Sequence, residues 1–321
     1  MNQYRAPWWL PGGHAQTIIP ARVLPAPTVI YRRERWDAPD GDFIDVDFVT
    51  PEPSNPNASL MVLFHGLEGD SRSHYARILM QGCRRRSWLG MVVHFRGCSG
   101  EPNRMPRAYH SGDSEEIDWI LRRLALRWPR AQRFAVGISL GGNALAKWAG
   151  ERGEQASGIV SACATVSAPF DLVAGGRSLD RGANVIYSRL FLQTMRKKAM
   201  SKAQQFPGLF DARKVVQSRS MYAFDDAFTA PLHGFRGVLD YWSRASAKPL
   251  LAAIAIPTLA LNARNDPIVP ADSLPDHGQV SRHVRQDVPS EGGHVGFFAQ
   301  GRHADRWYLR ERIFQFFQKG S

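Results

Sequence analysis

The sequence has little cysteine and no long apolar run. Its 321 residues include three cysteines, Cys83, Cys98 and Cys163, an odd number without the paired spacing of a metal site. We therefore expect reduced thiols, which are usual in the cytoplasm. No stretch reaches the roughly 18 apolar residues of a membrane-spanning helix, and residues 1–11 lack the apolar core of a signal peptide. These absences predict a cytoplasmic protein without a transmembrane segment.

Acidic residues are scarce relative to basic ones. The chain has 29 Asp and Glu against 41 Lys and Arg, a formal net charge of +12. Such a charge attracts nucleic acid or an anionic membrane surface. The basic residues are scattered, apart from small clusters at 84–86 and 196–198, and no nucleic-acid-binding motif accompanies them. We therefore expect no nucleic-acid partner and at most weak peripheral membrane contact, and the sequence leaves the oligomeric state open.

Residues 137–141 read Gly-Ile-Ser-Leu-Gly, the G-x-S-x-G pattern of a turn that presents a nucleophilic serine. The apolar run 134–136 before it is typical of a buried strand, and residues 143–149 after it favour a helix. Glycines on both sides of Ser139 permit a sharp turn where strand and helix nearly touch. The pattern predicts Ser139 as a catalytic nucleophile.

A serine hydroxyl needs a base, and the base needs an orienting partner. Asp266 follows the predicted strand 256–263, and His294 lies in a Gly-Gly loop after the predicted strand 284–288. The carboxyl ends of parallel strands lie at one edge of a sheet, so Ser139, Asp266 and His294 can meet there. Their order along the chain is that of the α/β hydrolases. We predict that they form a catalytic triad.

The predicted strand 60–64 ends in the loop His65-Gly66-Leu67-Glu68-Gly69. Acyl transfer builds negative charge on the carbonyl oxygen, which two backbone N–H groups normally stabilise. By their positions these would be the N–H groups of Leu67 and Leu140. His65 could be a metal ligand or a base, but we interpret it as a structural residue of the loop. The mechanism requires no metal and no organic cofactor.

The chain divides into three parts by pattern. Residues 1–35 are rich in proline and aromatics, and we expect an irregular wrapping segment there. We predict an α/β-hydrolase core at residues 36–170 and 250–321. Two antiparallel strands around Asp40-Gly41 are followed there by alternating strands and helices. This order favours a mostly parallel central sheet flanked by helices on both faces. We expect helices at 74–86, 115–128 and 304–317.

Strand–helix alternation stops between residues 171 and 249. The position of this insertion, between a sheet strand and the strand before Asp266, predicts a helical cap over the active-site edge, with a helix at 179–200. The alternative is that the insertion only extends the core. Apolar residues that could receive an acyl chain are Phe191, Met195, Phe206, Phe210, Phe224 and Phe228.

Four stretches, 7–17, 65–69, 94–103 and 109–113, together resemble the YheT-like branch of the α/β hydrolases. The similarity runs from near residue 7 to the end of the chain. The branch includes bacterial esterases and eukaryotic lipid hydrolases and acyltransferases, and the resemblance implies a Ser-Asp-His triad. Two roles stay open for His14 and for residues 96–103: lining the site, or locking the N-terminal segment and loops together.

These patterns favour a serine hydrolase that cleaves carboxylic esters with small to medium acyl chains. Its substrate would be a small-molecule ester, and the acyl group would be held transiently on Ser139. Three alternatives are an acyltransferase that uses an alcohol acceptor, a monoacylglycerol-type lipase, and a non-catalytic binding protein on the same scaffold.

Overall fold

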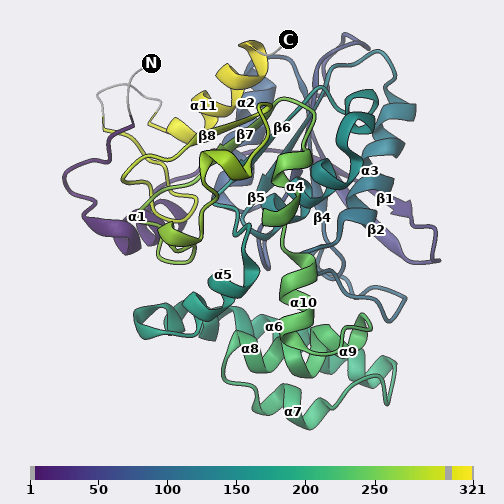
Figure 1. The fold of residues 1–321 in the computed structure, drawn as a ribbon. Coiled ribbons are helices and arrows are strands. Elements are labelled where there is room, and N and C mark those ends of the chain that lie inside the picture. The colour runs from purple at the N-terminus through teal and green to yellow at the C-terminus, as the bar shows by residue number, and fades with distance from the viewer. Residues whose placement is uncertain (1–3, 301–305, 320–321) are drawn as a thin grey trace.

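A sheet of eight strands forms the centre of the protein (Figure 1). The computed structural model describes residues 4–300 and 306–319. The strands lie in the order β1-β2-β4-β3-β5-β6-β7-β8. Their bounds are Tyr31–Asp37 (β1), Phe43–Val49 (β2), Leu60–Phe64 (β3), Leu89–His94 (β4), Arg133–Ile138 (β5), Ala162–Val166 (β6), Thr258–Leu261 (β7) and Val284–Asp287 (β8).

Most neighbouring strands are parallel. Only β1 with β2 and β2 with β4 pair antiparallel, and β3, β4, β5, β6, β7 and β8 pair in parallel. The predicted α/β-hydrolase sheet is confirmed. Strand β1 begins at Tyr31, inside the segment that was predicted to be irregular, because its arginines lie opposite aspartates of β2. Arg33 pairs with Asp47 and Arg35 with Asp45. Such cross-strand ion pairs stabilise an edge strand. The strand lacks the alternating apolar residues by which a strand is usually recognised in a sequence.

Successive residues of the central strands face opposite sides of the sheet. In β3, Leu60, Val62 and Phe64 pack in one apolar cluster and Met61 and Leu63 in another. Helices α3 (Ser114–Arg127) and α4 (Leu140–Arg152) cover the first face. Helices α2 (His74–Arg85) and α11 (Tyr308–Lys319) cover the second. Two buried faces explain why these strands appear in the sequence as continuous apolar runs.

Between β6 and β7 the described chain contains helices and no strand of the sheet. These helices lie together beyond one end of the strands (Figure 1). They bury an apolar cluster of their own that includes Leu192, Phe224 and Trp242. Asp171, Asp211 and Ser220 cap three of them. The bounds are Leu172–Leu179 (α5), Val185–Gln205 (α6), Ala212–Gln217 (α7), Met221–Phe224 (α8), Ala230–Leu232 (α9) and Val238–Ala245 (α10), with a π-helical turn at Asp225–Thr229.

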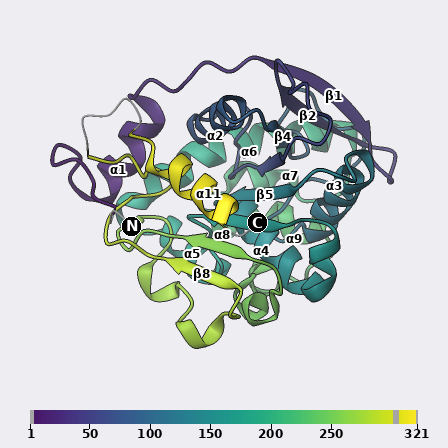
Figure 2. The same cartoon turned by 90° about the horizontal axis from the view of Figure 1, so that it is seen from above.

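Two expected elements differ from the structure. The predicted helix 179–200 is interrupted: Asp180 accepts hydrogen bonds from the backbone of Met221 and Tyr222, Gly182 has a φ of 54°, and α6 begins only at Val185. The proline-rich N-terminal segment is not irregular throughout, because Gly12–Arg22 forms helix α1 beside the core (Figure 2). Residues 12–19 contain no proline and suffice for about two turns. Residues 304–305 of the predicted last helix lie outside the described residues.

Candidate active site

Ser139 lies at the turn between β5 and α4. Its backbone has a φ of 51°, a conformation that a residue with a side chain adopts at a cost. A Cβ atom at Gly137 would clash with the backbone of Gly141, and one at Gly141 would clash with the carbonyl groups of Phe64 and His65. The two glycines of the motif therefore allow β3, β5 and α4 to meet closely enough for Ser139 to project from the turn.

The structure brings Ser139, His294 and Asp266 together. His294 Nε2 lies 2.9 Å from Ser139 Oγ, and His294 Nδ1 lies 2.8 Å from Asp266 Oδ2. The other carboxylate oxygen of Asp266 accepts hydrogen bonds from the backbone N–H groups of Ile268 and Val269. The Asp266 side chain is fully buried and that of His294 is 10% exposed. This chain of hydrogen bonds can move a proton from the serine hydroxyl to the imidazole.

The loop after β3 lies against this serine. A Cβ atom at Gly66 would be 3.2 Å from Ser139 Cβ. Within the described residues, neither the N–H of Leu67 nor that of Leu140 donates to another protein group. Glu68 has a φ of 57°, and its N–H donates to the hydroxyl of Tyr109. Two unengaged backbone donors thus flank Ser139, which is what an oxyanion requires.

His65 is engaged entirely within the protein. Its Nδ1 donates to the carbonyl of Gly66 (2.7 Å), and its Nε2 accepts from the N–H of Phe95 (3.1 Å). Burial lowers the pKa of His65 to about 3, so the ring is neutral. The part of the chain that the structure describes contains no group of three or more His, Cys, Asp or Glu able to hold a metal ion. His65 therefore holds the loop in shape.

Helix α1 supports the loops that carry His294 and Asp266 through Thr17 and Gln16, two residues to which the sequence analysis gave no role of their own. Thr17 Oγ1 accepts the backbone N–H of His294 (2.8 Å). Gln16 Oε1 accepts both the N–H of Gly292 (2.8 Å) and the side-chain amide of Asn265 (2.9 Å). The sequence signal for this support was the stretch 7–17, one of the four stretches that resemble the YheT-like branch, and the role of its His14 had stayed open. Its buried polar side chains fix the two loops relative to each other.

The other open motifs have mainly structural contacts. His14 Nδ1 lies 2.9 Å from the hydroxyl of Tyr187, so α1 also contacts α6. Arg96 is buried and pairs with Asp42 and Glu116. Arg96 nevertheless reaches the wall of the cavity described next. Residues 96–103 therefore both lock the loop and line the site.

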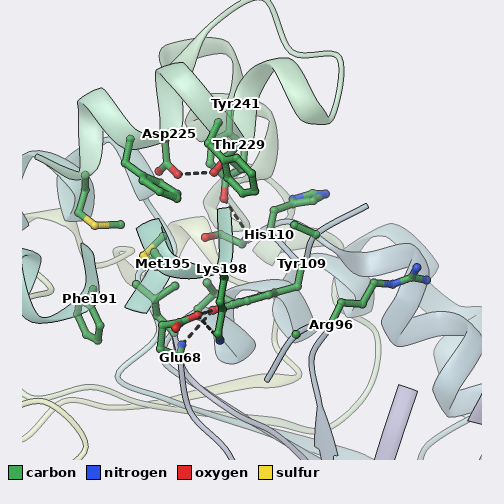
Figure 3. A pocket seen from close by; sticks show the side chains of 18 of the residues that line it. Glu68, Arg96, Tyr109, His110, Phe191, Met195, Lys198, Asp225, Thr229 and Tyr241 are labelled. Atoms are coloured by element: carbon green, nitrogen blue, oxygen red, sulfur yellow. Dashed lines mark hydrogen bonds and ion pairs between the residues drawn. The ribbon is translucent and has the colours of Figure 1, made fainter. Parts of the chain in front are cut away.

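A cavity of about 450 Å³ lies between the helical insertion and the core (Figure 3). Ser139 and His294 are among the residues that line it. Its size suits a small to medium ligand. Two of the apolar residues expected here, Phe206 and Phe210, do not line it and pack instead against Lys202 and Phe228. The apolar part of the wall includes Leu172, Phe191, Met195, Phe224, Phe228 and Trp242.

One carboxyl group of the cavity wall is buried in the insertion. Asp225 accepts hydrogen bonds from the hydroxyl of Thr229 (2.7 Å) and the indole N–H of Trp242 (2.8 Å). Burial raises the pKa of Asp225 to about 6, more than these hydrogen bonds lower it. The part of the cavity wall that belongs to the insertion therefore contains a carboxyl group, Asp225, that titrates near neutral pH.

Fold and site together define an α/β hydrolase. A family model described as the alpha/beta hydrolase fold matches residues 59–299, and the chain belongs to this family. Within the family it falls in the YheT-like branch. It is 37% identical over 302 residues to YheT of Escherichia coli (strain K12), named as a candidate esterase, which covers 94% of this chain and 88% of the relative.

Other relatives are named as lipid hydrolases. Human "Phospholipase ABHD3" is 27% identical over 90% of this chain and 72% of its own length. "Monoacylglycerol lipase" of Saccharomyces cerevisiae (strain ATCC 204508 / S288c) is 26% identical over 86% of this chain and 61% of its own length. These names support a hydrolase of the esterase or lipase type.

Solved structures share the fold at low identity. The Pyrococcus furiosus esterase Pf2001 superposes with a TM-score of 0.57 at 13% identity, over 93% of this chain and 98% of its own. E-2-(acetamidomethylene)succinate hydrolase gives a TM-score of 0.56 at 16% identity, over 90% of this chain and all of its own. Among the described residues, no helix is both long and apolar enough to cross a membrane.

Proposed function

We propose that the protein hydrolyses carboxylic esters with small to medium acyl chains through an acyl-enzyme on Ser139. The observation that carries this proposal is the hydrogen-bonded chain from Ser139 Oγ through His294 to Asp266, at the wall of a largely apolar cavity. The hydrolase relatives are consistent with it. A protein that only binds ligands on this scaffold would not need a serine, a histidine and an aspartate joined by hydrogen bonds.

The reaction has two halves. Ser139 Oγ attacks the acyl carbon while His294 Nε2 takes its proton, and Asp266 stabilises the imidazolium that forms. The N–H groups of Leu67 and Leu140 donate to the carbonyl oxygen as it becomes negative. His294 then protonates the leaving alcohol. In the second half His294 takes a proton from water, the resulting hydroxide attacks the acyl carbon, and the carboxylic acid leaves as Ser139 regains its proton.

The proposal includes a division of the chain. Residues 36–170 and 250–321 supply the reacting groups, residues 171–249 form the cap that receives the acyl chain, and residues 1–35 brace the core. The separate apolar cluster of the cap supports this division. An alcohol could replace water in the second half, which would make the protein an acyltransferase. Cytoplasmic location and the lack of a cofactor requirement remain predictions from the sequence.

The test is the replacement Ser139→Ala. Hydrolysis of p-nitrophenyl butyrate should fall by about 10³-fold or more, because the bond-forming oxygen is removed. A fluorophosphonate probe should label the wild type at Ser139 and leave the variant unlabelled. Ser201→Ala is the control, since Ser201 lines the same cavity without a histidine partner among the described residues. Labelling at Ser201, or full activity of Ser139→Ala, would refute the proposal.

A further inference from the structure

One side of helix α6 forms a continuous wall of the cavity. Phe191, Met195, Lys198, Lys202 and Gln205 all line it. Their spacing of three or four residues places them on a single face of the helix. Along this face the side chains change from apolar to cationic, and Figure 3 shows Phe191, Met195 and Lys198 at the cavity. At 1.5 Å per residue, Phe191 and Lys202 are separated by roughly 16 Å along the axis.

The change from apolar to cationic falls beside the reacting groups. Lys198 Nζ lies 2.8 Å from Glu68 Oε1 (Figure 3). Glu68 directly follows Leu67, whose N–H we assign to the oxyanion. The carbonyl of a bound ester would therefore lie near the level of Lys198. Apolar side chains extend from that level in one direction along α6, and basic ones in the other.

Most cations at the cavity already have an acidic partner. Arg96 pairs with Asp42 and Glu116, Arg107 with Asp113, and Lys198 with Glu68. Those pairs leave little charge for a ligand.

Lys202 differs from these cations. Its Nζ donates to the carbonyl of Met105 (2.6 Å), and no described carboxylate lies within ion-pair distance of it. The side chain is half-buried, and burial lowers its pKa. Lys197, which is exposed and also lines the cavity, has no described carboxylate partner either. Holding a half-buried ammonium without a carboxylate in ion-pair contact costs free energy, which an anionic ligand would offset.

We propose that the cavity selects esters that are aliphatic on one side of the scissile bond and anionic on the other, with Lys202 binding the anion. The anion is a phosphate or a carboxylate, since both offer oxygens to an ammonium group. This inference rests on the proposed ester hydrolysis for its reaction. The binding preference itself does not, and it can be measured without turnover.

Three octanoyl esters test the preference: those of 1-propanol, of 3-hydroxypropanoate and of 3-hydroxypropyl phosphate. All release octanoate, whose formation gives kcat/KM below the critical micelle concentration. We expect the wild type to prefer an anionic ester about tenfold over the neutral one in kcat/KM. Lys202→Gln should lower this anionic-to-neutral ratio about tenfold. Added salt should reduce the ratio as well. Whichever anionic ester reacts faster identifies phosphate or carboxylate as the group recognised.

The control is Lys214→Gln, which removes the same charge from the exposed surface of α7. It should leave the ratio within about twofold of the wild type. An anionic-to-neutral ratio near one in the wild type, or equal ratios in the two lysine variants, would overturn the inference.

Binding separates this inference from the proposed function. Calorimetry on Ser139→Ala should show octyl phosphate binding about tenfold tighter than octanol, and the added substitution Lys202→Gln should abolish that difference. If no ester is hydrolysed but this binding difference is found, the proposed function fails and the anionic preference stands. Equal binding of octyl phosphate and octanol means the cavity does not select an anion.

Discussion

The side-chain carbonyl of Gln16 accepts a hydrogen bond from the backbone N–H of Gly292, 276 positions away in the sequence. The same oxygen accepts from the side chain of Asn265, which directly precedes Asp266. Gln16 is only 1% exposed, so water cannot replace these contacts. One amide thus joins helix α1 to both the loop of His294 and the loop of Asp266. The N-terminal segment is a support for the candidate active site.

Replacing Gln16 with alanine should lower activity because the positions of the His294 and Asp266 loops are no longer fixed. Loosening both loops misplaces the imidazole, and an error of about 1 Å can reduce the rate about a hundredfold. We expect a loss of about ten- to a hundredfold in kcat with little change in KM. The loss of buried hydrogen bonds should also lower the free energy of unfolding by about 1–3 kcal/mol. Steady-state kinetics and urea unfolding measure the two effects. The exposed Gln193→Ala on α6 should show neither, and an unchanged kcat in Gln16→Ala would contradict the supporting role.

Asp266→Asn should retain the fold and lose most of the rate. Oδ1 is fixed by the N–H groups of Ile268 and Val269, so the new NH₂ group would face His294 Nδ1. That contact favours the wrong tautomer, and a loss of about 10⁴-fold in kcat is expected. Ester hydrolysis with circular dichroism as a folding check measures it. The exposed Asp272→Asn is the matched control. If Asp272→Asn were the slower variant, Asp266 would not be the partner of the histidine.

Shortening the apolar wall should change acyl-chain preference. Met195→Ala enlarges the cavity beside the reacting groups and removes contacts that a short chain uses. The ratio of kcat/KM for octanoate over butyrate esters should rise by about three- to tenfold. Leu209→Ala, an exposed position of the insertion that does not line the cavity, should leave the ratio unchanged. Identical chain-length profiles for the two variants would place acyl selection elsewhere.

Asp225 should make stability depend on pH. Its folded-state pKa of about 6 exceeds the ordinary value of 3.8, so the folded protein binds the proton more tightly than the unfolded chain. The stabilising contribution is complete below pH 3.8 and is lost as the pH rises through about 6. At roughly 1.4 kcal/mol per pH unit, the loss is on the order of 3 kcal/mol.

The corresponding experiment compares the wild type with Asp225→Asn. The asparagine carbonyl can accept from Trp242, while its NH₂ group donates to a rotated Thr229 hydroxyl. Urea unfolding between pH 4.5 and about 7.5 should show the variant becoming more stable relative to the wild type as the pH rises. A constant difference across that range would mean that Asp225 does not titrate there.

Local sequence patterns predicted much of the fold. Strand β3 occupies residues 60–64 as expected, because a run of apolar side chains can be buried on both faces of a sheet. Helix α3 follows its apolar periodicity. The charged strand β1 was largely missed, since its stability comes from partners on β2. Helix α1 was missed because the prolines around it outweighed the short stretch between them.

The sequence by itself determined the turn at Ser139 and the order in which Asp266 and His294 follow, because backbone sterics and strand ends require particular residues at particular positions. Their catalytic roles stay predictions that the geometry supports. Only the tertiary structure decided that Gln16 joins the loops of His294 and Asp266, and that α6 places Lys202 in the cavity wall without a carboxylate. Local patterns report the period and sterics of a few residues. Contacts between distant segments depend on how whole elements pack, which no short window of sequence contains.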